Sequence, residues 1–353
     1  MFDSMQERLQ KAAGAEMPVA HDTRLTSTEI AALWTTYMDY SMVNCVYKHF
    51  LSQVESGDVR SLLEYDLDLA DKRTAWVKDT FERDSIPVPK GFTDEDVNIH
   101  APRLYSDSFY LYYILNKARI AMPVNGLALT TSARSDVQEF YARCCGSTAV
   151  VSQKVTNLLL AKGLYVRSPY ITVQKTGDTV KKQNFMAGFL GERRPLSAAE
   201  ISGLNYGVRM NNLGRYLLIG FRQVTSTKQL RDYLDRGVEM SKRFIERYSS
   251  FLAKENISSP MPSETFVTDS TVSPFSERLI MNHTLFVAMA GLSSKGAILS
   301  TCFRRDISSA LTLSMTEIAN YLDDGLNIAI KNTWMEEPPL VVDRKELVSQ
   351  LKH

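Results

Sequence analysis

The sequence has little of what marks several common classes of protein. It contains four cysteines in 353 residues, and they have neither the spacing of a zinc site nor that of a redox pair. No segment reaches the roughly 18 consecutive apolar residues that a transmembrane helix needs. The first residues also lack the apolar stretch of a signal peptide. We therefore expect a cytoplasmic protein that has reduced cysteines and no membrane partner.

An excess of charge of one sign is also missing. The chain has 41 Lys and Arg against 40 Asp and Glu, so its formal net charge is +1. Charges of both signs are interspersed, whereas proteins that bind nucleic acid present a basic face. The composition therefore predicts no nucleic-acid partner. Phosphate-binding glycine loops and serine-hydrolase motifs are absent as well, so no catalytic residue is predicted.

Histidine is scarce and never has the spacing of a di-iron carboxylate site. In a four-helix bundle, such a site takes a Glu from each of two helices and a Glu-x-x-His from each of the other two. No histidine of this chain follows a glutamate at that spacing. We therefore expect no metal and no cofactor. His49 is predicted to lie at the surface or the boundary of its helix.

Self-similarity is the strongest positive feature of the sequence. Residues 25–171 align with residues 196–341, at an offset of 171 in the first half and of 170 from the third helix on. A repeat of this length is a whole domain, because solenoid units have only about 20–50 residues. The predicted organisation is an N-terminal extension over 1–24, copy one over 25–171, a linker over 172–195, copy two over 196–341 and a tail over 342–353.

Each copy is predicted to begin with a helix that has a strong start signal. Thr26-x-x-Glu29 and Ser197-x-x-Glu200 are both capping boxes, and each is flanked by the apolar pair of a hydrophobic staple. Apolar residues then recur at helical spacing through four segments of each copy. In copy one these segments begin near 26, 58, 106 and 135, and in copy two they cover about 197–224, 227–254, 275–303 and 306–331.

A connection of about twenty residues separates the second and third helices of copy one. It begins at Pro87 and Pro89, which cannot continue a helix. A connection of this length can carry the chain along the whole bundle, so that the two helices run parallel. We therefore predict an all-α protein, made of two tandem four-helix bundles with ferritin-like connectivity that arose by internal duplication.

Copy one is the half whose predicted interior contains several polar residues. Asp66 and Arg73 fall in the centre of the apolar stripe of the second helix, when residues are placed at 100° per position. Copy two has Gly237 and Phe244 at the equivalent positions. Further side chains of copy one that are predicted to point inward at mid-bundle are those of Ser41, Asn44, Asn116 and Thr148.

Two interpretations of these polar residues remain open. Burying an unpaired charge costs several kcal/mol, so Asp66 and Arg73 should have partners. They could pair with each other in a salt-bridge network that sets the helix register. Alternatively, the inward-pointing residues line a pocket, and the candidate ligand-binding residues are then Ser41, Asn44, Asp66, Arg73, Asn116 and Thr148.

Several segments resemble a family of tandem ferritin-like proteins of unknown function. They are Leu-Thr-Ser-x-Glu-Ile at 25–30, Leu-Leu-Glu-Tyr at 62–65, Gly-Phe-Thr-x-Glu-Asp-Val-Asn at 91–98, Ala-Pro-Arg-Leu-Tyr-Ser-Asp at 101–107 and Gly-Leu-Tyr-Val-Arg-x-Pro at 163–169. The family occurs in spore-forming bacteria and their relatives and is similar to a spore coat protein group. The resemblance implies paired four-helix bundles and no established activity. Position 73 can be His in the family pattern, and the presence of Arg73 here disfavours a metal site further.

Three functions are compatible with these observations. The first is a non-enzymatic structural or interaction protein, associated with the spore coat or with stress, that binds a protein partner or forms a homo-oligomer. The second is a binding protein for a small molecule or a metal ion, which would use the polar interior of copy one. The third is an oxidoreductase with a degenerate ferritin-like site, which the missing Glu-x-x-His pairs disfavour most. We expect the first for the chain as a whole.

Overall fold

The computed structural model describes residues 24–173, 176–177, 179–181, 183–189, 193–259 and 265–345. In these ranges the chain is helical and contains no β-strand. No helix within them is long and apolar enough to cross a membrane. Of the predicted extension over 1–24, residues 1–23 lie outside the described residues. Of the predicted tail over 342–353, residues 346–353 lie outside them.

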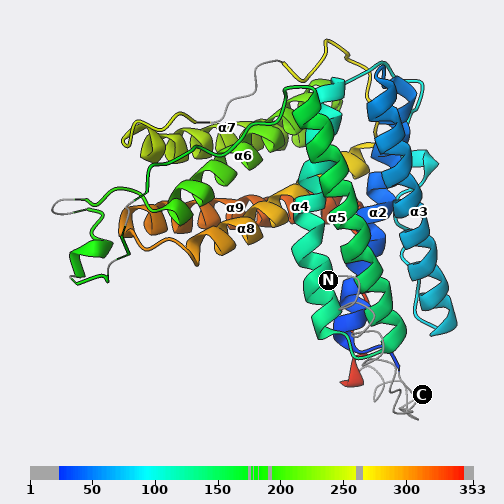
Figure 1. The fold of residues 1–353 in the computed structure, drawn as a ribbon. Helices are drawn as coiled ribbons and strands as arrows, with labels where there is room; N and C mark the ends of the chain where they lie inside the picture. Colours follow the sequence, from blue (N-terminus) through cyan, green and yellow to red (C-terminus); the bar gives the residue numbers. More distant parts are fainter. Residues whose placement is uncertain are drawn as a thin grey trace, which may run out of the picture.

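The first copy forms an upright bundle of four helices (Figure 1). Its helices are α2 (Ser27–Gln53), α3 (Gly57–Arg83), α4 (Asp107–Thr131) and α5 (Ser135–Ala161). The predicted capping box of α2 is present, since the Thr26 hydroxyl accepts from the Glu29 backbone N–H and the Glu29 carboxylate accepts from the Thr26 backbone N–H. Gly163 follows the end of α5 with φ of +68°, the left-handed conformation that glycine adopts readily.

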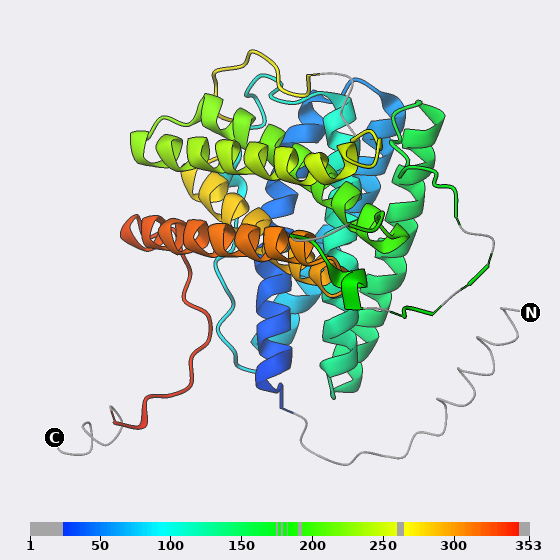
Figure 2. The ribbon, with the colours of Figure 1, turned by 90° about the vertical axis from the view of Figure 1, so that its left-hand side faces the viewer.

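The second copy forms a second bundle, whose helices run across those of the first (Figures 1 and 2). Its helices are α6 (Ala198–Val224), α7 (Lys228–Ala253), α8 (Glu277–Leu299) and α9 (Arg305–Lys331). Ser197 and Glu200 form the predicted capping box of α6. The prediction of eight helices in two bundles is therefore confirmed, with the largest difference at α8, which ends at Leu299 rather than near 303.

The connectivity within each bundle is ferritin-like, as predicted. Residues 84–106 connect α3 to α4 along the length of the first bundle. Asp107, the first residue of α4, accepts a hydrogen bond of 2.7 Å from the backbone N–H of Ser56, which directly precedes α3. In the second bundle, Glu277 at the start of α8 accepts one of 2.7 Å from Thr227, which directly precedes α7. Both helix pairs therefore begin at the same end of their bundle and run parallel.

The two bundles are joined by their long crossover segments in a symmetric way. Val97 forms an isolated antiparallel bridge with Phe275, and Tyr105 forms one with Val267. Val267 is the repeat equivalent of Val97, and Phe275 is the equivalent of Tyr105. The same two positions are therefore in contact in both directions between the crossover segments. This is the contact geometry of a twofold-symmetric dimer, and here it forms within one chain.

This contact between bundles buries side chains that a single bundle would leave at its surface. His49 was predicted to lie at the surface or boundary of its helix, and this prediction is wrong. Its side chain is fully buried, and its ring packs edge-on against Phe275 of the other copy with 5.5 Å between ring centres. The helical periodicity of copy one contains no information about a face that only the second bundle covers.

Candidate functional site

The predicted polar residues of bundle one do not form the predicted pair. Asp66 accepts a hydrogen bond of 2.6 Å from the hydroxyl of Tyr47 and one of 3.2 Å from the ammonium of Lys117. Its ion-pair partner is thus Lys117 on α4 and not Arg73 on its own helix. Asp66 and Arg73 are both buried, so their predicted inward orientation is correct and their predicted direct pairing is wrong.

Arg73 makes its own set of hydrogen bonds toward α2 and α5. Its guanidinium donates to the hydroxyls of Tyr40, Ser147 and Thr148, the last two at 2.7 and 3.3 Å. It also donates to the backbone carbonyl of Cys144 at 3.3 Å. This buried cation is therefore satisfied by neutral oxygen atoms, which fix the position of α3 against α5.

Ser41 and Asn44 do not join this cluster. Ser41 accepts a hydrogen bond of 3.2 Å from the backbone N–H of Phe92 and so holds the crossover segment against α2. Asn44 is half-buried and donates to the carboxylate of Asp71 at 2.8 Å, on the outer side of the bundle. Both predicted positions therefore stabilise contacts between elements rather than line a pocket with Asp66.

The space beside the remaining cluster is small. Asp66, Arg73, Lys117 and Thr148 border a void of about 10 Å³. A void of this size holds at most about one water molecule. The predicted residues are thus not gathered around one cavity inside bundle one, and among them only Asn116 lines the larger cavity described next.

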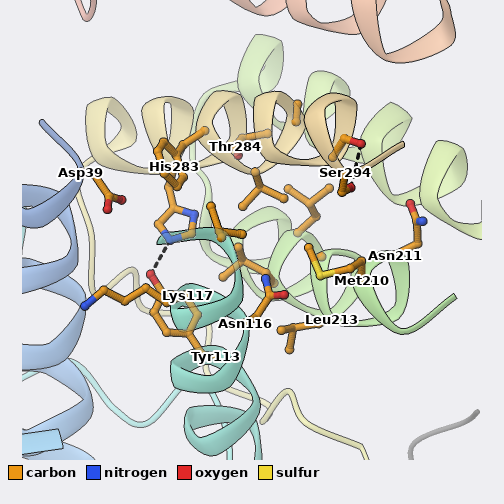
Figure 3. A pocket seen from close by; sticks show the side chains of 18 of the residues that line it. Asp39, Tyr113, Asn116, Lys117, Met210, Asn211, Leu213, His283, Thr284 and Ser294 are labelled. Atoms are coloured by element: carbon orange, nitrogen blue, oxygen red, sulfur yellow. Dashed lines mark hydrogen bonds between the residues drawn. The ribbon is translucent and has the colours of Figure 1, made fainter. Parts of the chain in front are cut away.

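A cavity of about 150 Å³ lies between the two bundles (Figure 3). Helices α2 and α4 of the first bundle face it, and from the second bundle it is lined by residues of α6, α7, α8 and α9. Most of its wall is apolar, with Leu213, Met210 and Val287 among the lining residues. It is therefore an apolar chamber that exists only because the bundles are paired.

Two charged groups face this cavity from bundle one. Asp39 of α2 has no hydrogen bond or ion pair with another described residue, and Lys117 of α4 lies on the same side (Figure 3). Burial raises the pKa of Asp39 to about 6, although Lys117 and Arg73 act in the opposite direction. Burial also lowers the pKa of Lys117, and Asp66 opposes that shift. Asp39 is thus an acceptor that the protein itself leaves available.

A tyrosine and a histidine from equivalent positions of the two copies meet at the cavity wall. The hydroxyl of Tyr113 on α4 and Nε2 of His283 on α8 form a hydrogen bond of 2.7 Å (Figure 3). Among the described residues Nδ1 of His283 has no hydrogen-bond partner. Burial lowers the pKa of His283 to about 4, so its imidazole is neutral at pH 7. The pair therefore links the bundles and does not carry a charge.

Lys295 of α8 lines the cavity from the interior of bundle two. Its side chain is buried, and its Nζ lies 4.8 Å from the ring centre of Phe244. Burial lowers the pKa of Lys295 to about 8, Arg247 shifts it in the same direction and Glu317 opposes them. The amine is therefore mostly protonated at neutral pH, inside an apolar wall.

Reasoning on single helices missed Asp39, Lys117, His283 and Lys295. One signal was present in the third helix of copy one, where Phe109, Tyr110, Tyr112 and Tyr113 leave no polar face at its start. A helix that is apolar all round is buried on all sides, which indicates a second layer of protein. No group of three or more His, Cys, Asp or Glu that could hold a metal ion occurs within the part of the chain that the structure describes.

The fold and the cavity define the class of protein. It is a pair of tandem ferritin-like four-helix bundles with a chamber between them. The family described as "Protein of unknown function (DUF3231)" matches the chain twice, over residues 15–176 and 184–347. The chain belongs to this family and carries two tandem copies of its domain, which confirms the resemblance seen in the sequence.

Two solved structures are similar to parts of the chain. One is a "putative spore coat protein" from Bacillus halodurans C-125, with 16% identity, a TM-score of 0.40 and coverage of 42% of this chain and 98% of the other. The second is a protein from Anabaena variabilis ATCC 29413 that contains DJ-1/ThiJ/PfpI-like and ferritin-like domains, with 12% identity, a TM-score of 0.34 and coverage of 55% and 53%. None of the curated proteins matches the chain. The chain's own helix connectivity, and not these low similarities, defines its fold.

Proposed function

We propose that this protein is a non-enzymatic binding protein for a small, largely apolar molecule, which it holds in the chamber between its bundles. The observation that carries this proposal is the chamber of about 150 Å³ with a mostly apolar wall. An engineered cavity of similar volume in another protein binds benzene. Of the three functions considered from the sequence, the second, a binding protein for a small molecule, is thereby favoured. Its proposed site lies between the two copies and not in the interior of copy one.

The polar groups of the chamber support binding rather than catalysis. The imidazole of His283 is held by Tyr113, and its lowered pKa makes it a weak base. Catalysis by a nucleophile requires a base within hydrogen-bond reach of it. The lining hydroxyls of Thr284 and Ser294 donate instead to backbone carbonyls of their own helix, at 2.8 and 3.0 Å. A few polar groups in an apolar wall are typical of sites that orient a ligand.

The biological setting belongs to the same proposal. The resemblance to spore coat proteins suggests a cytoplasmic protein that becomes associated with the spore, where it would bind its ligand alone or with a protein partner. Immunodetection in fractions of vegetative cells and of purified spores from the source organism tests this part. A signal confined to vegetative cells would contradict it and leave the binding proposal intact.

Binding is tested with fluorobenzene, a neutral apolar probe, followed by ¹⁹F NMR on the purified full chain. Gly214 lines the chamber, and a Cβ placed there would meet Val287 at 3.6 Å, so that Gly214→Leu fills the chamber. We expect saturable binding to the parent chain and its loss in Gly214→Leu.

Gly126→Leu is the matched control, because Gly126 also lies inside a helix but a Cβ there meets no atom within 4 Å. This variant should bind fluorobenzene as the parent does. Absence of binding to the parent, or equal binding to Gly214→Leu, would overturn the proposal.

A further inference from the structure

Lys295 is a buried cation that the described protein leaves without an anion. Its side chain is only 3% exposed. Its contacts are with aromatic rings, at 4.8 Å from the ring centre of Phe244 and 6.0 Å from that of Tyr248. No hydrogen bond or ion pair joins Nζ to another described residue. Burying an ammonium group without an acceptor is costly, so a partner is expected from outside the chain.

Copy one shows what satisfies a cation at this level of a bundle. There the cation is Arg73, and Thr148 is one of its acceptors. In copy two the equivalent positions hold Phe244 and Ile318, which offer no acceptor. The cation has moved to position 295, whose equivalent in copy one is Asn125. Bundle two therefore keeps a buried cation on a different helix. The equivalents of the acceptors Tyr40 and Ser147 are Asn211 and Glu317, and neither forms a hydrogen bond or ion pair with Lys295.

Glu317, the acidic group that acts on the pKa of Lys295, is already engaged. Glu317 accepts hydrogen bonds from Arg247 at 2.7 Å and from Arg243 at 3.2 Å, toward the outer side of bundle two. Lys295 faces the chamber instead, where an added Cβ at Gly291 would lie 4.0 Å from Nζ. Space for a ligand group therefore exists directly beside the amine.

We infer that Lys295 binds the carboxylate of a small monocarboxylic acid whose apolar part fills the chamber. This inference rests on the proposed function and names its class of ligand. The other ammonium that faces the chamber, that of Lys117, is paired with Asp66. The ammonium of Lys295 alone matches one carboxylate, since a phosphate dianion would need further donors. Asp39 faces the chamber from the other bundle and disfavours a second carboxylate on the same ligand.

The test compares two probes that differ only in the acid group, 4-fluorobenzoate and fluorobenzene, by ¹⁹F NMR titration of the full chain at pH 7. We expect 4-fluorobenzoate to bind at least about tenfold more tightly to the parent, as one charge-assisted contact contributes about that much. Lys295→Met should remove this preference and keep the affinity for fluorobenzene. Lys242→Met, at an exposed lysine of α7, makes the same change in net charge and should leave both affinities unchanged.

The outcomes separate the two proposals. If fluorobenzene does not bind to the parent, the chamber is not a binding site and both proposals fail. If fluorobenzene binds but 4-fluorobenzoate binds no better, or if Lys295→Met keeps the preference for the acid, only the assignment to Lys295 is overturned. Fluorobenzene binding by Lys295→Met also reports that the variant is folded, and Lys295→Gln provides the same comparison with a polar side chain of similar length.

Discussion

Arg73 of copy one and Lys295 of copy two are both buried cations, but they lie on different helices and have different surroundings. Arg73 of α3 is bound by hydroxyl and carbonyl oxygen atoms of α2 and α5. Lys295 of α8 lies against aromatic rings and faces the chamber, with no hydrogen bond or ion pair to another described residue. Arg73 is therefore satisfied within the protein, whereas Lys295 faces the chamber without an acceptor among the described residues.

Removal of the Arg73 side chain should destabilise the protein. In Arg73→Leu, the hydroxyl of Tyr40 and the carbonyl of Cys144 lose a donor inside the bundle, which costs about 2 kcal/mol. Urea unfolding at pH 7 measures this change. Arg143→Leu is the control, because Arg143 of α5 is largely exposed and pairs with the exposed Glu139, and its loss should cost less than about 0.5 kcal/mol. Equal stability of Arg73→Leu and the parent would contradict the role assigned to Arg73.

The orientation of side chains could be predicted at the residue scale, but their partners could not. Helical phase places Asp66, Arg73 and Thr148 on the inner face of their helices, where the structure has them. The helical phase does not tell which residue of a neighbouring helix will face a given side chain. Lys117 was therefore missed as the partner of Asp66. Asp39 was missed for a related reason, since the second bundle alone makes its outer face a cavity wall.

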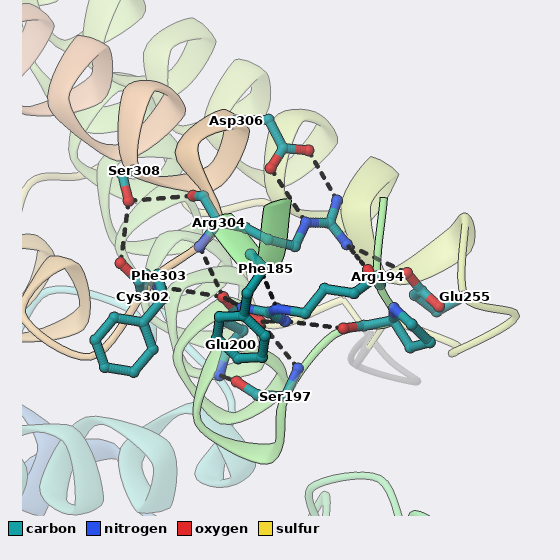
Figure 4. A network of polar contacts seen from close by, with 11 residues as sticks. Phe185, Arg194, Ser197, Glu200, Glu255, Cys302, Phe303, Arg304, Asp306 and Ser308 are labelled. Atoms are coloured by element: carbon teal, nitrogen blue, oxygen red, sulfur yellow. Dashed lines mark hydrogen bonds and ion pairs between the residues drawn. The ribbon is translucent and has the colours of Figure 1, made fainter. Parts of the chain in front are cut away.

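At the scale of elements, the capping glutamates do more than begin a helix. The buried carboxylate of Glu200 caps α6 and also accepts from the backbone N–H groups of Phe303 and Arg304, at the start of α9 (Figure 4). Arg194 adds two hydrogen bonds of 2.8 Å to the same carboxylate. Glu29 makes the equivalent contacts with the start of α5 in the first bundle. One acid therefore connects the first and last helices of each copy.

Glu200→Gln should destabilise the protein in a pH-dependent way. Burial acts to raise the pKa of Glu200, but hydrogen bonds from Arg194, Ser197 and Arg304 outweigh it and lower the pKa from 4.5 to about 2. The folded state thus holds its proton less tightly than the unfolded state. The carboxylate contributes its full stability, of the order of 3 kcal/mol, above about pH 4.5, and this contribution is lost as the pH falls toward 2.

Urea unfolding of the parent and of Glu200→Gln at pH 7, 5, 4 and 3 measures the effect. The difference in free energy of unfolding should be largest at pH 7 and should decrease below about pH 4.5. Glu246→Gln, at an exposed glutamate of α7, should match the parent at every pH. A difference between the parent and Glu200→Gln that stays constant from pH 7 to pH 3 would exclude the charge of Glu200 as its cause.

Local sequence was sufficient to predict most of the elements. The capping boxes at Thr26 and Ser197 fixed two helix starts, and Gly163 fixed one helix end, because each acts through its own backbone neighbours. The length of the crossover also predicted the parallel arrangement of α3 and α4. The contact between crossovers could not be predicted, since Val97 and Phe275 meet only when both bundles are complete.

At the scale of the whole molecule, the near-twofold arrangement allows the side chains at equivalent positions of the two copies to differ in size. Gly220 of α6 is the equivalent of His49, and it lies against Tyr105, whose hydroxyl donates to the carbonyl of Leu217 at 2.7 Å. On the other side of the symmetric contact, His49 packs against Phe275. Gly220 thus leaves room for the hydroxyl of Tyr105 at the place where the crossover segment of copy one packs against α6 of copy two.

Gly220→Ala should therefore weaken the contact between bundles. Its Cβ would lie 2.4 Å from the hydroxyl oxygen of Tyr105, whose ring is fully buried and has no room to move, and the overpacking should cost about 2 kcal/mol. Gly146→Ala is a matched control in the interior of α5, where an added Cβ meets nothing within 4 Å. It should stabilise the protein by up to about 1 kcal/mol through helix propensity. Urea unfolding that gives the same sign for both variants would contradict this explanation.

The paired bundles should unfold as one cooperative unit, because they share a core. One continuous cluster of buried side chains includes Phe50 and Tyr110 of the first bundle and Phe221 and Leu279 of the second. Neither bundle can then open without exposing apolar surface of the other, so calorimetry should show a single transition whose calorimetric and van't Hoff enthalpies agree. Arg73→Leu in bundle one and Gly220→Ala in bundle two should both lower the temperature of that same transition. Two transitions, each shifted by only one of these variants, would mean that the bundles are independent domains and that the chamber between them is not a fixed part of the fold.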